Sequence, residues 1–338
     1  MKSMKRILVT GGFGFIGTTL LELLVQDKSN SVHVVDDLST SPVDLQDYLE
    51  QIGNSSNLTY DICTIEEYFV RNNIPNYDEV YHLASPVGPL GVLNSAGDIV
   101  RIIVRDCYII MDYCIERGAK LLNVSTSEIY GGGVEGFCSE DTPRVVSPTT
   151  TVRMEYAMGK LAAETALINT CRINKLHALI VRPFNVAGPR QSPRGGFVVP
   201  RLIQQADANI PLTVYGDGSA VRAFTHVRDV SEGIILVLRN GKSGEAYNVG
   251  SPSNKINILD LARRVIKLLG SRSKVSFVDP KFIYGDFFAE ANDKYPSIEK
   301  AETELGWKGK IDIDRVIWDA YLEFKRQKEA GILKFEIT

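Results

Sequence analysis

Cysteine, histidine and tryptophan are scarce in this chain of 338 residues, which has 5 cysteines, 4 histidines and 2 tryptophans. The cysteines are odd in number and widely spaced, with no C-x-x-C pair among them. The sequence therefore indicates neither a disulfide framework nor a zinc site. The histidines are dispersed as well, without the spacing of metal ligands. We expect no metal, and a reducing, cytoplasmic compartment.

An excess of charge of either sign is also missing. The 38 Lys and Arg residues nearly balance the 41 Asp and Glu residues, which gives a formal net charge of -3. Such a chain has no general attraction for nucleic acid or anionic lipid. No segment offers the roughly 18 uncharged apolar residues of a membrane span, and the apolar run at residues 7–9 is too short for a signal peptide. We expect neither a nucleic-acid partner nor a membrane partner.

The composition is otherwise that of a globular protein, with 44% apolar and 23% charged residues. At about 150 residues per domain, the length suggests two domains. Short apolar runs at 7–10, 32–35, 80–84, 121–124 and 178–181 alternate with helix-like stretches. Continuous apolar strands between helices predict a doubly wound parallel sheet, an α/β fold of the Rossmann type.

The sequence changes in character after Pro183, where Pro, Gly and Arg become frequent and the predicted strands become shorter. Helical patterns near 259–269 and 312–325 close the chain. We expect a smaller C-terminal α/β domain there. The predicted division is a Rossmann domain at 1–184, rejoined by about 224–250, and a second domain at 185–223 and 251–338.

A glycine fingerprint follows the first predicted strand. Gly11, Gly14 and Gly17, with Phe15 and Ile16 before the third glycine, lie where the strand turns into a helix. In a dinucleotide site the first glycine permits the turn, the second admits the pyrophosphate, and the third lets the helix approach the strand. An isolated triplet can also be a turn without a ligand, but here strand and helix flank it in the required order.

An acidic residue at the end of the second predicted strand supports a nucleotide site. Asp36 lies about twenty residues beyond the glycines, where a carboxylate accepts both ribose hydroxyls of an adenosine. Asp37 follows it, with no Arg or Lys nearby to hold the extra phosphate of NADP, so NAD is favoured. Asp61 and Ile62 could flank the adenine or simply end a strand, and the sequence leaves both interpretations open.

A Tyr-x-x-x-Lys pair provides a candidate base. Tyr156 and Lys160 share one helical face, so the ammonium can lower the pKa of the phenol from its usual value of about 10. Such a pair is expected about once by chance, and Tyr321 with Lys325 is a second one. We assign that second pair to core packing and a solvated lysine. Tyr156 differs because hydroxyls and a carboxylate gather at 125–131, after a central strand.

These residues resemble the extended short-chain dehydrogenases/reductases that modify nucleotide sugars, and the resemblance covers nearly the whole chain. The matching motifs are Gly11 to Gly17, Asp36-Asp37-Leu38, His82-Leu83-Ala84-Ser85, Ser125 to Gly131, Tyr156 with Lys160, Arg182-Pro183-Phe184-Asn185, Gly188-Pro189-Arg190, 212–218, Arg222-Ala223-Phe224, 247–250 and Leu305-Gly306-Trp307. The resemblance implies that the Rossmann domain binds NAD and that the second domain binds a nucleoside-diphosphate sugar.

The resemblance also implies roles for individual residues. The implied catalytic residues are Thr126, Ser127, Glu128, Tyr156 and Lys160. The implied NAD site adds Leu83, Ala84, Ser85, Tyr156, Lys160 and Pro183 to the glycines, Phe15, Ile16, Asp36, Asp37, Asp61 and Ile62. The implied substrate contacts are Ser85, Thr126, Arg153, Asn185, Arg190, Val199 with Pro200, Tyr215, Arg222 and Lys294, and Arg194 is expected near the nucleotide. For Arg190 and Arg222 on the pyrophosphate, the alternative is a surface ion pair.

The reaction follows from a ketone at C4 of the sugar. In this family Tyr156, helped by Thr126, would remove the C4 hydroxyl proton while NAD accepts the hydride. The ketone can then be reduced on the other face, lose water, or lose CO₂ from a C6 carboxylate. Thr126-Ser127-Glu128 is similar to both UDP-glucuronate decarboxylases and GDP-mannose dehydratases, whereas Arg153 is similar to an element of the decarboxylases alone.

UDP-glucuronate decarboxylation is therefore the leading interpretation, with a 4-epimerase or a 4,6-dehydratase as the alternative. Two departures from the decarboxylase pattern stand against it, Val152 in place of a proline and Lys294-Tyr295-Pro296 in place of Arg-Lys-Pro. In a decarboxylase Glu128 would lie near the departing carboxylate, protonated through a raised pKa; in a dehydratase it would take the C5 proton. A plain hydrogen-bond acceptor is the third possibility for Glu128. A catalytically idle NAD-binding regulator is the remote alternative.

The resemblance further implies a homodimer. The helical stretches 99–116 and 153–171 carry apolar faces that could form a four-helix contact with a second copy or pack on the sheet. Arg101, Arg105 and Asp106 make this region partly charged, so a monomer is the alternative.

Overall fold

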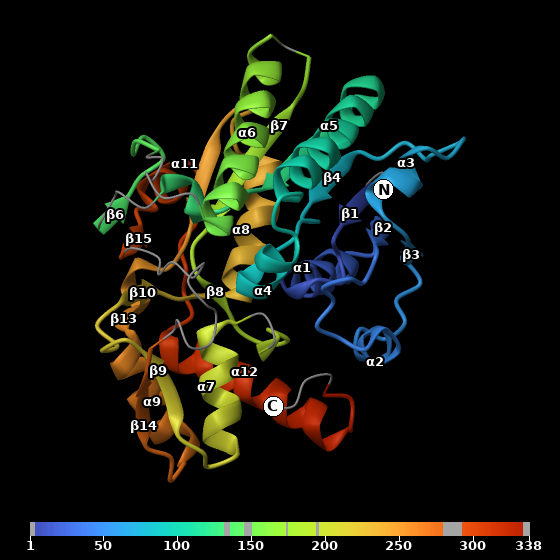
Figure 1. Cartoon of the computed structure of the whole chain (residues 1–338). Coiled ribbons are helices and arrows are strands. Elements are labelled where there is room, and N and C mark those ends of the chain that lie inside the picture. The colour runs from blue at the N-terminus through green and yellow to red at the C-terminus, as the bar shows by residue number, and fades with distance from the viewer. Residues whose placement is uncertain are drawn as a thin grey trace.

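The computed structural model of the chain describes residues 4–131, 136–144, 151–173, 175–193, 196–279 and 293–333 (Figure 1). The strands are β1 (Lys5–Thr10), β2 (Asn30–Asp36), β3 (Leu58–Ile62), β4 (Glu79–His82), β5 (Lys120–Val124), β6 (Gly136–Cys138), β7 (Ala178–Pro183), β8 (Val186–Ala187), β9 (Leu212–Tyr215), β10 (Val221–Ala223), β11 (Thr225–His226), β12 (Ala246–Val249), β13 (Lys255–Asn257), β14 (Val275–Val278) and β15 (Lys294–Pro296). The α-helices are α1 (Phe15–Gln26), α2 (Leu45–Gln51), α3 (Ile65–Phe69), α4 (Gly88–Asn94), α5 (Ile99–Arg117), α6 (Val152–Arg172), α7 (Val198–Asp207), α8 (Val227–Asn240), α9 (Ile258–Leu269), α11 (Glu299–Leu305) and α12 (Ile313–Glu329). Two short 3₁₀ helices are η1 (Ser127–Tyr130) and η3 (Pro252–Asn254).

The main sheet has seven parallel strands in the order β12-β7-β5-β4-β1-β2-β3. The predicted Rossmann fold is confirmed, and each of the five predicted apolar runs lies in or at the end of one of these strands. The strand order reverses between β1 and β4, so the loops after these two strands leave in opposite directions and open a crevice. The pairing of Thr10 with His82 puts the carboxyl ends of β1 and β4 side by side at that crevice.

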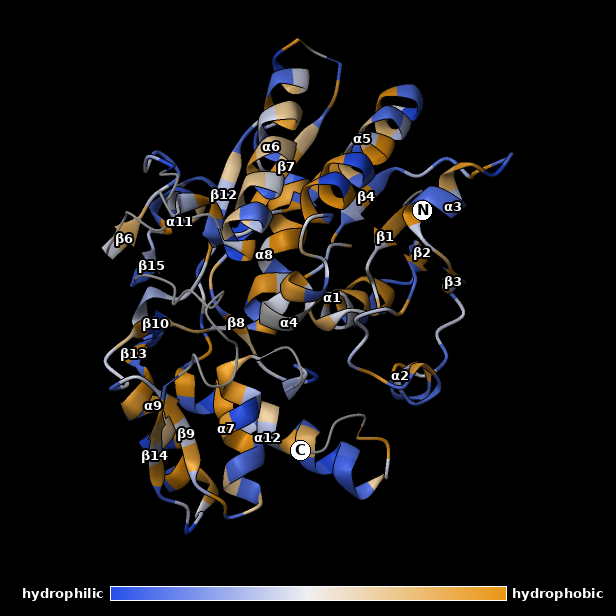
Figure 2. Cartoon of the chain, in the orientation of Figure 1, coloured by the Kyte–Doolittle hydropathy of each residue, from blue (hydrophilic) through white to orange (hydrophobic). Residues whose placement is uncertain are grey.

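Helices cover both faces of the sheet (Figure 1). On one face α3, α5 and α6 pack over a core that includes Leu8, Leu121 and Ile180. On the other face α1 and α8 pack over a core that includes Val9 and Leu122. The central strands β1, β4, β5 and β7 therefore contribute apolar side chains to both sides, as the unbroken apolar runs in the sequence predicted. Figure 2 shows these strands and the helix faces toward them in orange.

The C-terminal part of the chain has its own apolar cluster. Helices α7, α9 and α12 surround the parallel pair β9 and β14. Local sequence signals bound α9, because the side chain of Asn257 caps its first turn and Gly270, with φ of 63°, ends it. Between β9 and α9 the chain returns to the main sheet, where α8 packs against α1 and β12 pairs with β7.

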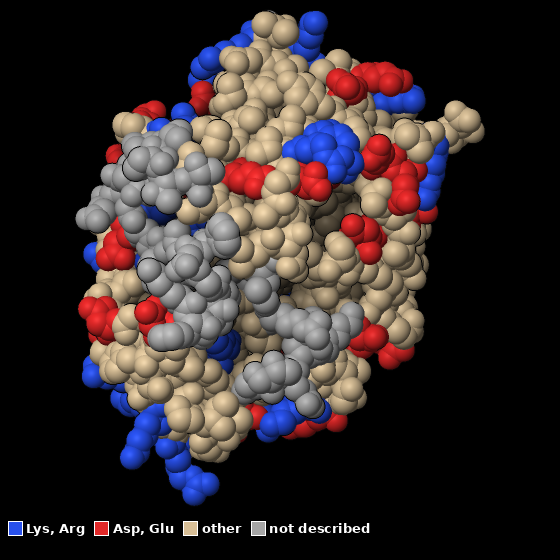
Figure 3. Space-filling view, viewed as in Figure 1, with Lys and Arg blue, Asp and Glu red and all other residues tan. Residues whose placement is uncertain are grey.

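The charged side chains are interspersed on the face shown in Figure 3, with neither sign forming a continuous field. This distribution agrees with the near-zero net charge of the sequence. Among the described residues, no helix is both long enough and apolar enough to cross a membrane.

Candidate active site

The glycine loop between β1 and α1 has no room for larger residues. A Cβ at Gly11, whose φ is 70°, would lie 2.6 Å from the backbone nitrogen of Ala84. A Cβ at Gly17 would lie 2.3 Å from the carbonyl oxygen of Gly11. The two glycines thus let the loop close against the Leu83–Ala84 backbone after β4, and let α1 approach β1.

Gly14 leaves the N-terminus of α1 open. It is the N-cap of this twelve-residue helix and offers no side chain to bond the first backbone N–H groups. A Cβ at Gly14 would meet a single neighbour, the Gly11 carbonyl oxygen at 3.2 Å. Unsatisfied N–H groups at a helix N-terminus attract anions. The loop therefore fits the pyrophosphate of a dinucleotide.

Asp36 fixes the end of β2 against this loop. One carboxylate oxygen accepts the backbone N–H of Phe13 at 2.9 Å, and the other accepts that of Leu38 at 2.8 Å. Burial raises the pKa of this carboxyl despite these two donors. Asp37 points elsewhere, with its carboxylate on the backbone and hydroxyl of Ser39. Asp36 is thus placed beside the loop where a ribose acceptor is expected.

The other predicted NAD contacts differ in their exposure and in their protein partners. Asp61 pairs with Arg71 at 2.8 Å and with His33 at 3.1 Å, and Ile62 is exposed at the end of β3. The hydroxyl of Ser85 donates to the carbonyl of Pro86 at 3.3 Å. These residues lie at the carboxyl edge of the sheet, as does Pro183 at the end of β7. Their contact with NAD stays a prediction.

Tyr156, Lys160 and Thr126 meet at the carboxyl end of β5. Tyr156 and Lys160 are both buried on α6. The Lys160 ammonium donates to the carbonyl of Val124 at 3.0 Å. The Thr126 hydroxyl bonds to the Tyr156 hydroxyl and also accepts the backbone N–H of Glu128 at 3.2 Å. The predicted triad of hydroxyl, phenol and ammonium is therefore assembled in one place.

The expected effect of Lys160 on Tyr156 is wrong for this arrangement. Burial raises the pKa of Tyr156 above its usual value; the bond to Thr126 works in the opposite direction, and the Glu128 charge adds to the rise. Lys160 is not among the groups that lower the pKa of Tyr156 in this arrangement. Burial also lowers the pKa of Lys160, to about 8. The phenol is therefore protonated at neutral pH. Its ionisation would need a positive charge that substrate or cofactor brings close to it.

Glu128 lies in a partly buried cluster of charges, in which Lys294 is buried and Glu128 and Arg153 are partly exposed. Its carboxylate is 3.2 Å from the Arg153 guanidinium and 3.7 Å from the Lys294 ammonium. Burial opposes ionisation of this carboxyl, but Arg153, Lys294 and Arg222 outweigh it and hold the pKa of Glu128 below its usual value. The expectation of a raised pKa is wrong, because the two cations arrive from α6 and β15 beside the carboxylate. Ser127, next to Glu128, offers its backbone carbonyl to Lys294 at 3.5 Å.

The predicted pyrophosphate ligands have protein partners. Arg190 pairs with Glu22 on α1 at 2.6 Å, and its guanidinium lies over the ring of Tyr48. Arg222 donates to Asp293 at 3.2 Å. A ligand phosphate would have to compete with these carboxylates. Both assignments stay predictions.

Around the predicted base site the residues differ in exposure. Val199 is buried in the C-terminal apolar cluster, whereas Tyr215 is partly exposed. Asn185 adopts φ of 36°, and its carbonyl accepts the backbone N–H of Thr225. Arg194 lies outside the described residues. No contact here distinguishes one base from another, so these roles also stay predictions.

Three residues near the site were missed by the sequence analysis. The Thr10 hydroxyl bonds to the Nδ1 atom of His82 at 2.8 Å, and burial, with the charge of Lys160, lowers the pKa of His82 to about 3. Arg201 stacks on Tyr215 at 4.0 Å, with two buried guanidinium nitrogens that lack hydrogen bonds. Asp293 holds Arg222. Only Thr10 had a signal, its place directly before the glycine loop.

The second Tyr-x-x-x-Lys pair has the structural role expected of it. Tyr321 packs at the edge of the C-terminal apolar cluster and against Trp318, with ring centroids 5.7 Å apart. Lys325 lies on the exposed side of α12, 3.9 Å from Asp207 and from Glu329. The described residues hold no group of three or more His, Cys, Asp or Glu side chains arranged for a metal ion.

Comparison with known proteins agrees with a dinucleotide-binding enzyme. Residues 7–250 match the model of the NAD dependent epimerase/dehydratase family, and the chain belongs to this family. It is 32% identical to the UDP-N-acetyl-alpha-D-glucosaminuronate decarboxylase of Bacillus cytotoxicus over 88% of this chain and 90% of the relative. It is 30% identical to UDP-glucuronic acid decarboxylase 1 of Xenopus tropicalis over 97% of this chain and 74% of the relative.

A solved structure gives the same result. The UDP-glucuronic acid 4-epimerase of Bacillus cereus, in complex with UDP-glucuronic acid and NAD, aligns with a TM-score of 0.79 at 27% identity. The alignment covers 95% of this chain and 99% of the epimerase. The chain is thus an NAD-dependent enzyme that modifies a nucleotide sugar.

The buried ammonium of Lys160 gives a pH prediction. Its pKa of about 8 lies below the usual value of about 10.4, so the positive charge is present at neutral pH and is lost as the pH rises through about 8. We expect kcat/KM to fall about tenfold per pH unit above that point. A Lys160→Arg variant keeps its charge and is expected to be slower but to lack this alkaline limb. A limb that persists in the arginine variant would contradict the assignment to Lys160.

Proposed function

We propose that this enzyme decarboxylates a UDP-linked uronic acid, with UDP-glucuronate as the first substrate to test, through a 4-keto intermediate. The observation that carries the proposal is the charge balance around Glu128. Arg153 and Lys294 face a single carboxylate, so the described part of the cluster holds one positive charge more than it holds negative charges. Lys294 is buried, so an excess positive charge beside it is costly, and a second carboxylate from the substrate would balance it.

The position of the cluster relative to the base supports this. Glu128 follows Thr126 by two residues on η1, and the Thr126 hydroxyl bonds to Tyr156. A sugar whose C4 hydroxyl meets Tyr156 and Thr126 would thus carry its C6 carboxylate toward Arg153 and Lys294. Burial lowers the pKa of Lys294, and a substrate carboxylate beside it would favour the charged form of its ammonium.

The residues of this chain then divide the work. Tyr156 removes the proton of the C4 hydroxyl, and Thr126 holds the phenol in place. NAD, when bound on the α1 loop, supplies the hydride chemistry at C4. A ketone at C4 makes the C6 carboxylate part of a β-keto acid: the C5–C6 bond breaks, CO₂ leaves, and the electron pair of that bond forms an enolate. The enolate takes up a proton at C5, and reduction of the C4 ketone then gives the pentose. Arg153 and Lys294 orient that carboxylate, and ionised Glu128 keeps both cations in place.

A 4-epimerase is the second candidate, and the Bacillus cereus 4-epimerase solved with UDP-glucuronic acid favours it. Both reactions begin with the same ketone and the same carboxylate. They differ in whether CO₂ leaves before the ketone is reduced. The two decarboxylase relatives support the first outcome.

The reaction is tested by incubating the purified enzyme with NAD and UDP-glucuronate and following the products by NMR. We expect a UDP-pentose and one equivalent of CO₂. UDP-galacturonate as the sole product would replace decarboxylation by 4-epimerisation. No turnover of UDP-glucuronate, with turnover of a neutral UDP-hexose, would remove uronic acids as the substrate class.

Lys294→Met tests the charge cluster. We expect the variant to bind UDP-glucuronate about ten to a hundredfold more weakly, since a charge-assisted hydrogen bond is lost. UDP-glucose, which lacks the carboxylate, provides the matched control because its affinity should change by less than about twofold. Equal losses for both ligands, measured by calorimetry, would show that Lys294 only supports the fold of the site.

We further propose that the two parts of the chain bind different ligands. Residues 1–184 with 224–250 would bind NAD, and 185–223 with 251–338 would bind the nucleotide sugar. In support, the glycine loop and Asp36 belong to the first part, whereas Arg222 and Tyr215 belong to the second. The crevice between β1 and β4 would then face the second part.

We also propose a cytoplasmic homodimer. The five cysteines are free thiols, which suits a reducing compartment. Large apolar side chains are exposed on α5 and α6, which pack against each other: Val100, Tyr108, Ile115 and Met158. A second copy placed symmetrically would cover them in a four-helix contact. Sedimentation at twice the chain mass of 37.4 kDa supports this proposal, and a monomer at micromolar concentration overturns it.

A further inference from the structure

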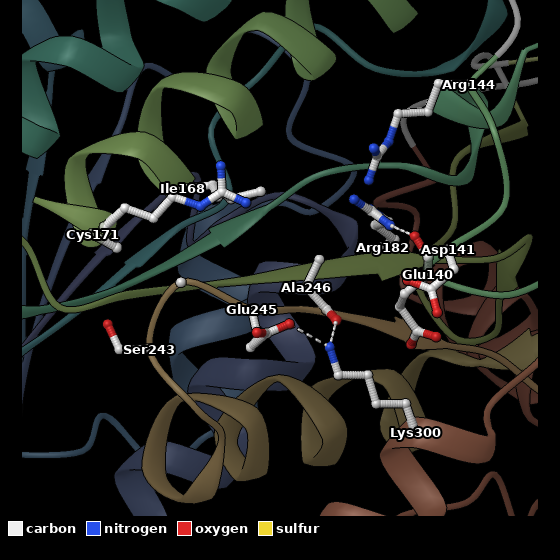
Figure 4. A pocket seen from close by; sticks show the side chains of 12 residues that line it. Glu140, Asp141, Arg144, Ile168, Cys171, Arg182, Ser243, Glu245, Ala246 and Lys300 are labelled. Atoms are coloured by element: carbon white, nitrogen blue, oxygen red, sulfur yellow. Dashed lines mark hydrogen bonds and ion pairs between the residues drawn. The ribbon is translucent and has the colours of Figure 1, made fainter.

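A cavity of about 350 Å³ lies away from the candidate active site. It is bounded by the C-terminal end of α6, the loop at 139–144, the turn before β12 and the start of α11 (Figure 4). None of its lining residues is among the predicted catalytic, NAD or sugar contacts. Its lining is rich in charged side chains, four of them basic and three acidic.

Two of the basic side chains that line this cavity are paired with carboxylates of the protein, which fixes their positions. Arg182 is fully buried and bonds to Glu164 at 2.7 Å. It also donates to the Tyr130 hydroxyl at 2.9 Å. On the opposite side Lys300 pairs with Glu245 at 2.7 Å and donates to the carbonyl of Ala246 at 3.0 Å. A ligand would therefore meet a preformed surface, which lowers the entropy cost of binding.

Two of the arginines that line the cavity, both exposed at the surface, remain without a carboxylate partner among the described residues. In the part of the chain that the structure describes, neither Arg144 nor Arg172 forms an ion pair, and Arg172 bonds only to the neutral side chain of Asn169, at 3.2 Å. In Figure 4 Arg144 extends from its loop toward the space that Arg182 and Glu140 border. Guanidinium forks of this kind suit the paired oxygens of a phosphate or a carboxylate.

The remaining polar groups suit hydroxyls. The Glu140 carboxylate accepts the backbone N–H of Asn248 at 2.7 Å and also its own backbone N–H, and its remaining lone pairs can accept further hydrogen bonds. Asp141 and Ser243 line the same cavity. Carboxylates beside a phosphate would repel it, but they accept hydrogen bonds from the hydroxyls of a polyol attached to that phosphate. The volume is that of a small-molecule site.

We infer that this cavity is a second ligand site, which binds a sugar phosphate through Arg144 and Arg172, with its hydroxyls on Glu140 and Asp141. The site is separate from the candidate active site, and its occupation does not depend on the reaction that the enzyme catalyses.

The test is calorimetric titration of the enzyme with glucose 1-phosphate, with UDP and NAD present at saturation to block the candidate active site. We expect one molecule bound per chain, with weaker binding of inorganic phosphate and no binding of glucose. An Arg144→Gln/Arg172→Gln variant should bind about a hundredfold more weakly, at tenfold for each guanidinium removed. Arg263→Gln, which removes an exposed arginine on α9, is the matched control and should bind as the wild type does.

Several results would overturn the inference. Binding that disappears when UDP saturates the enzyme would place the sugar phosphate in the active site. Binding that the double variant retains would exclude the two guanidiniums. Inorganic phosphate that binds as tightly as glucose 1-phosphate would exclude the contacts to sugar hydroxyls. None of these outcomes depends on turnover, so the result stands apart from the proposed decarboxylation.

Discussion

Tyr156→Phe is expected to reduce kcat by about a thousandfold or more, because the variant lacks the group that takes the proton of the C4 hydroxyl. The change removes one oxygen atom from a buried ring. That oxygen bonds to Thr126, so the free energy of unfolding should fall by no more than about 1 kcal/mol. Initial rates with UDP-glucuronate measure the loss, and thermal unfolding measures the cost to the fold.

NAD binding separates chemistry from assembly in this variant. The α1 loop and Asp36 do not touch the Tyr156 hydroxyl, so NAD should stay bound in the variant even if the predicted contact of Tyr156 with NAD is lost. Tyr321→Phe is the matched control, since it makes the same change in the second Tyr-x-x-x-Lys pair, where the ring only packs. A Tyr156→Phe enzyme within about twofold of the wild-type rate would contradict the proposed mechanism. It would mean that another group is the base, or that Tyr156 and Lys160 have no role in catalysis.

The parts of the fold that were predictable carry their signals locally. The apolar run at Ile7 to Thr10, the glycines after it and the helical period that follows lie within a few turns of chain. The same holds for α9, which has a capping residue at one end and a glycine at the other. Such signals need no distant partner, so periodicity and turn chemistry were enough to find them.

The short strands could not be found in this way. β15 at Lys294–Pro296 pairs with β6 at Gly136–Cys138, and β11 pairs with β8 over two residues. Each is too short for a period, and its partner lies far away in the sequence. These strands exist because the tertiary fold brings two extended segments together, and no local pattern reports that event.

The candidate site shows the same limit. Tyr156 and Lys160 could be paired from their spacing on one helix, and their burial on α6 agrees with it. The sign of the pKa shift of Glu128 could not be predicted, because Lys294 reaches it from β15 and Arg222 from β10. Nor could the partner of Arg190, since Glu22 stands on α1, in the other half of the fold. Electrostatics depends on distances in space, which spacing along the chain does not supply.

Glu164→Leu is expected to cause the largest loss of stability. The side chains of Glu164 and Arg182 are each only 1% exposed, and they are joined by bonds of 2.7, 3.0 and 3.2 Å. Removal of the carboxylate leaves a buried guanidinium without its counter-charge, which costs about 3–5 kcal/mol. The midpoint of thermal unfolding, followed by circular dichroism at one scan rate, should fall by about 4–7 °C.

The loss should be recovered when the stranded charge is removed as well. In Glu164→Leu/Arg182→Met both members become apolar, so the desolvation cost disappears, and most of the unfolding midpoint should return. Arg264→Gln is the control for an ordinary ion pair: its partner Asp314 is half exposed, and the change should cost less than about 1 kcal/mol.

A double variant no more stable than Glu164→Leu would mean that Arg182 stabilises the protein through its bond to Tyr130. Tyr130 belongs to η1, the short helix that also carries Glu128. In that case activity would fall with stability in every Arg182 variant, whereas a purely electrostatic role predicts that the folded double variant retains its turnover.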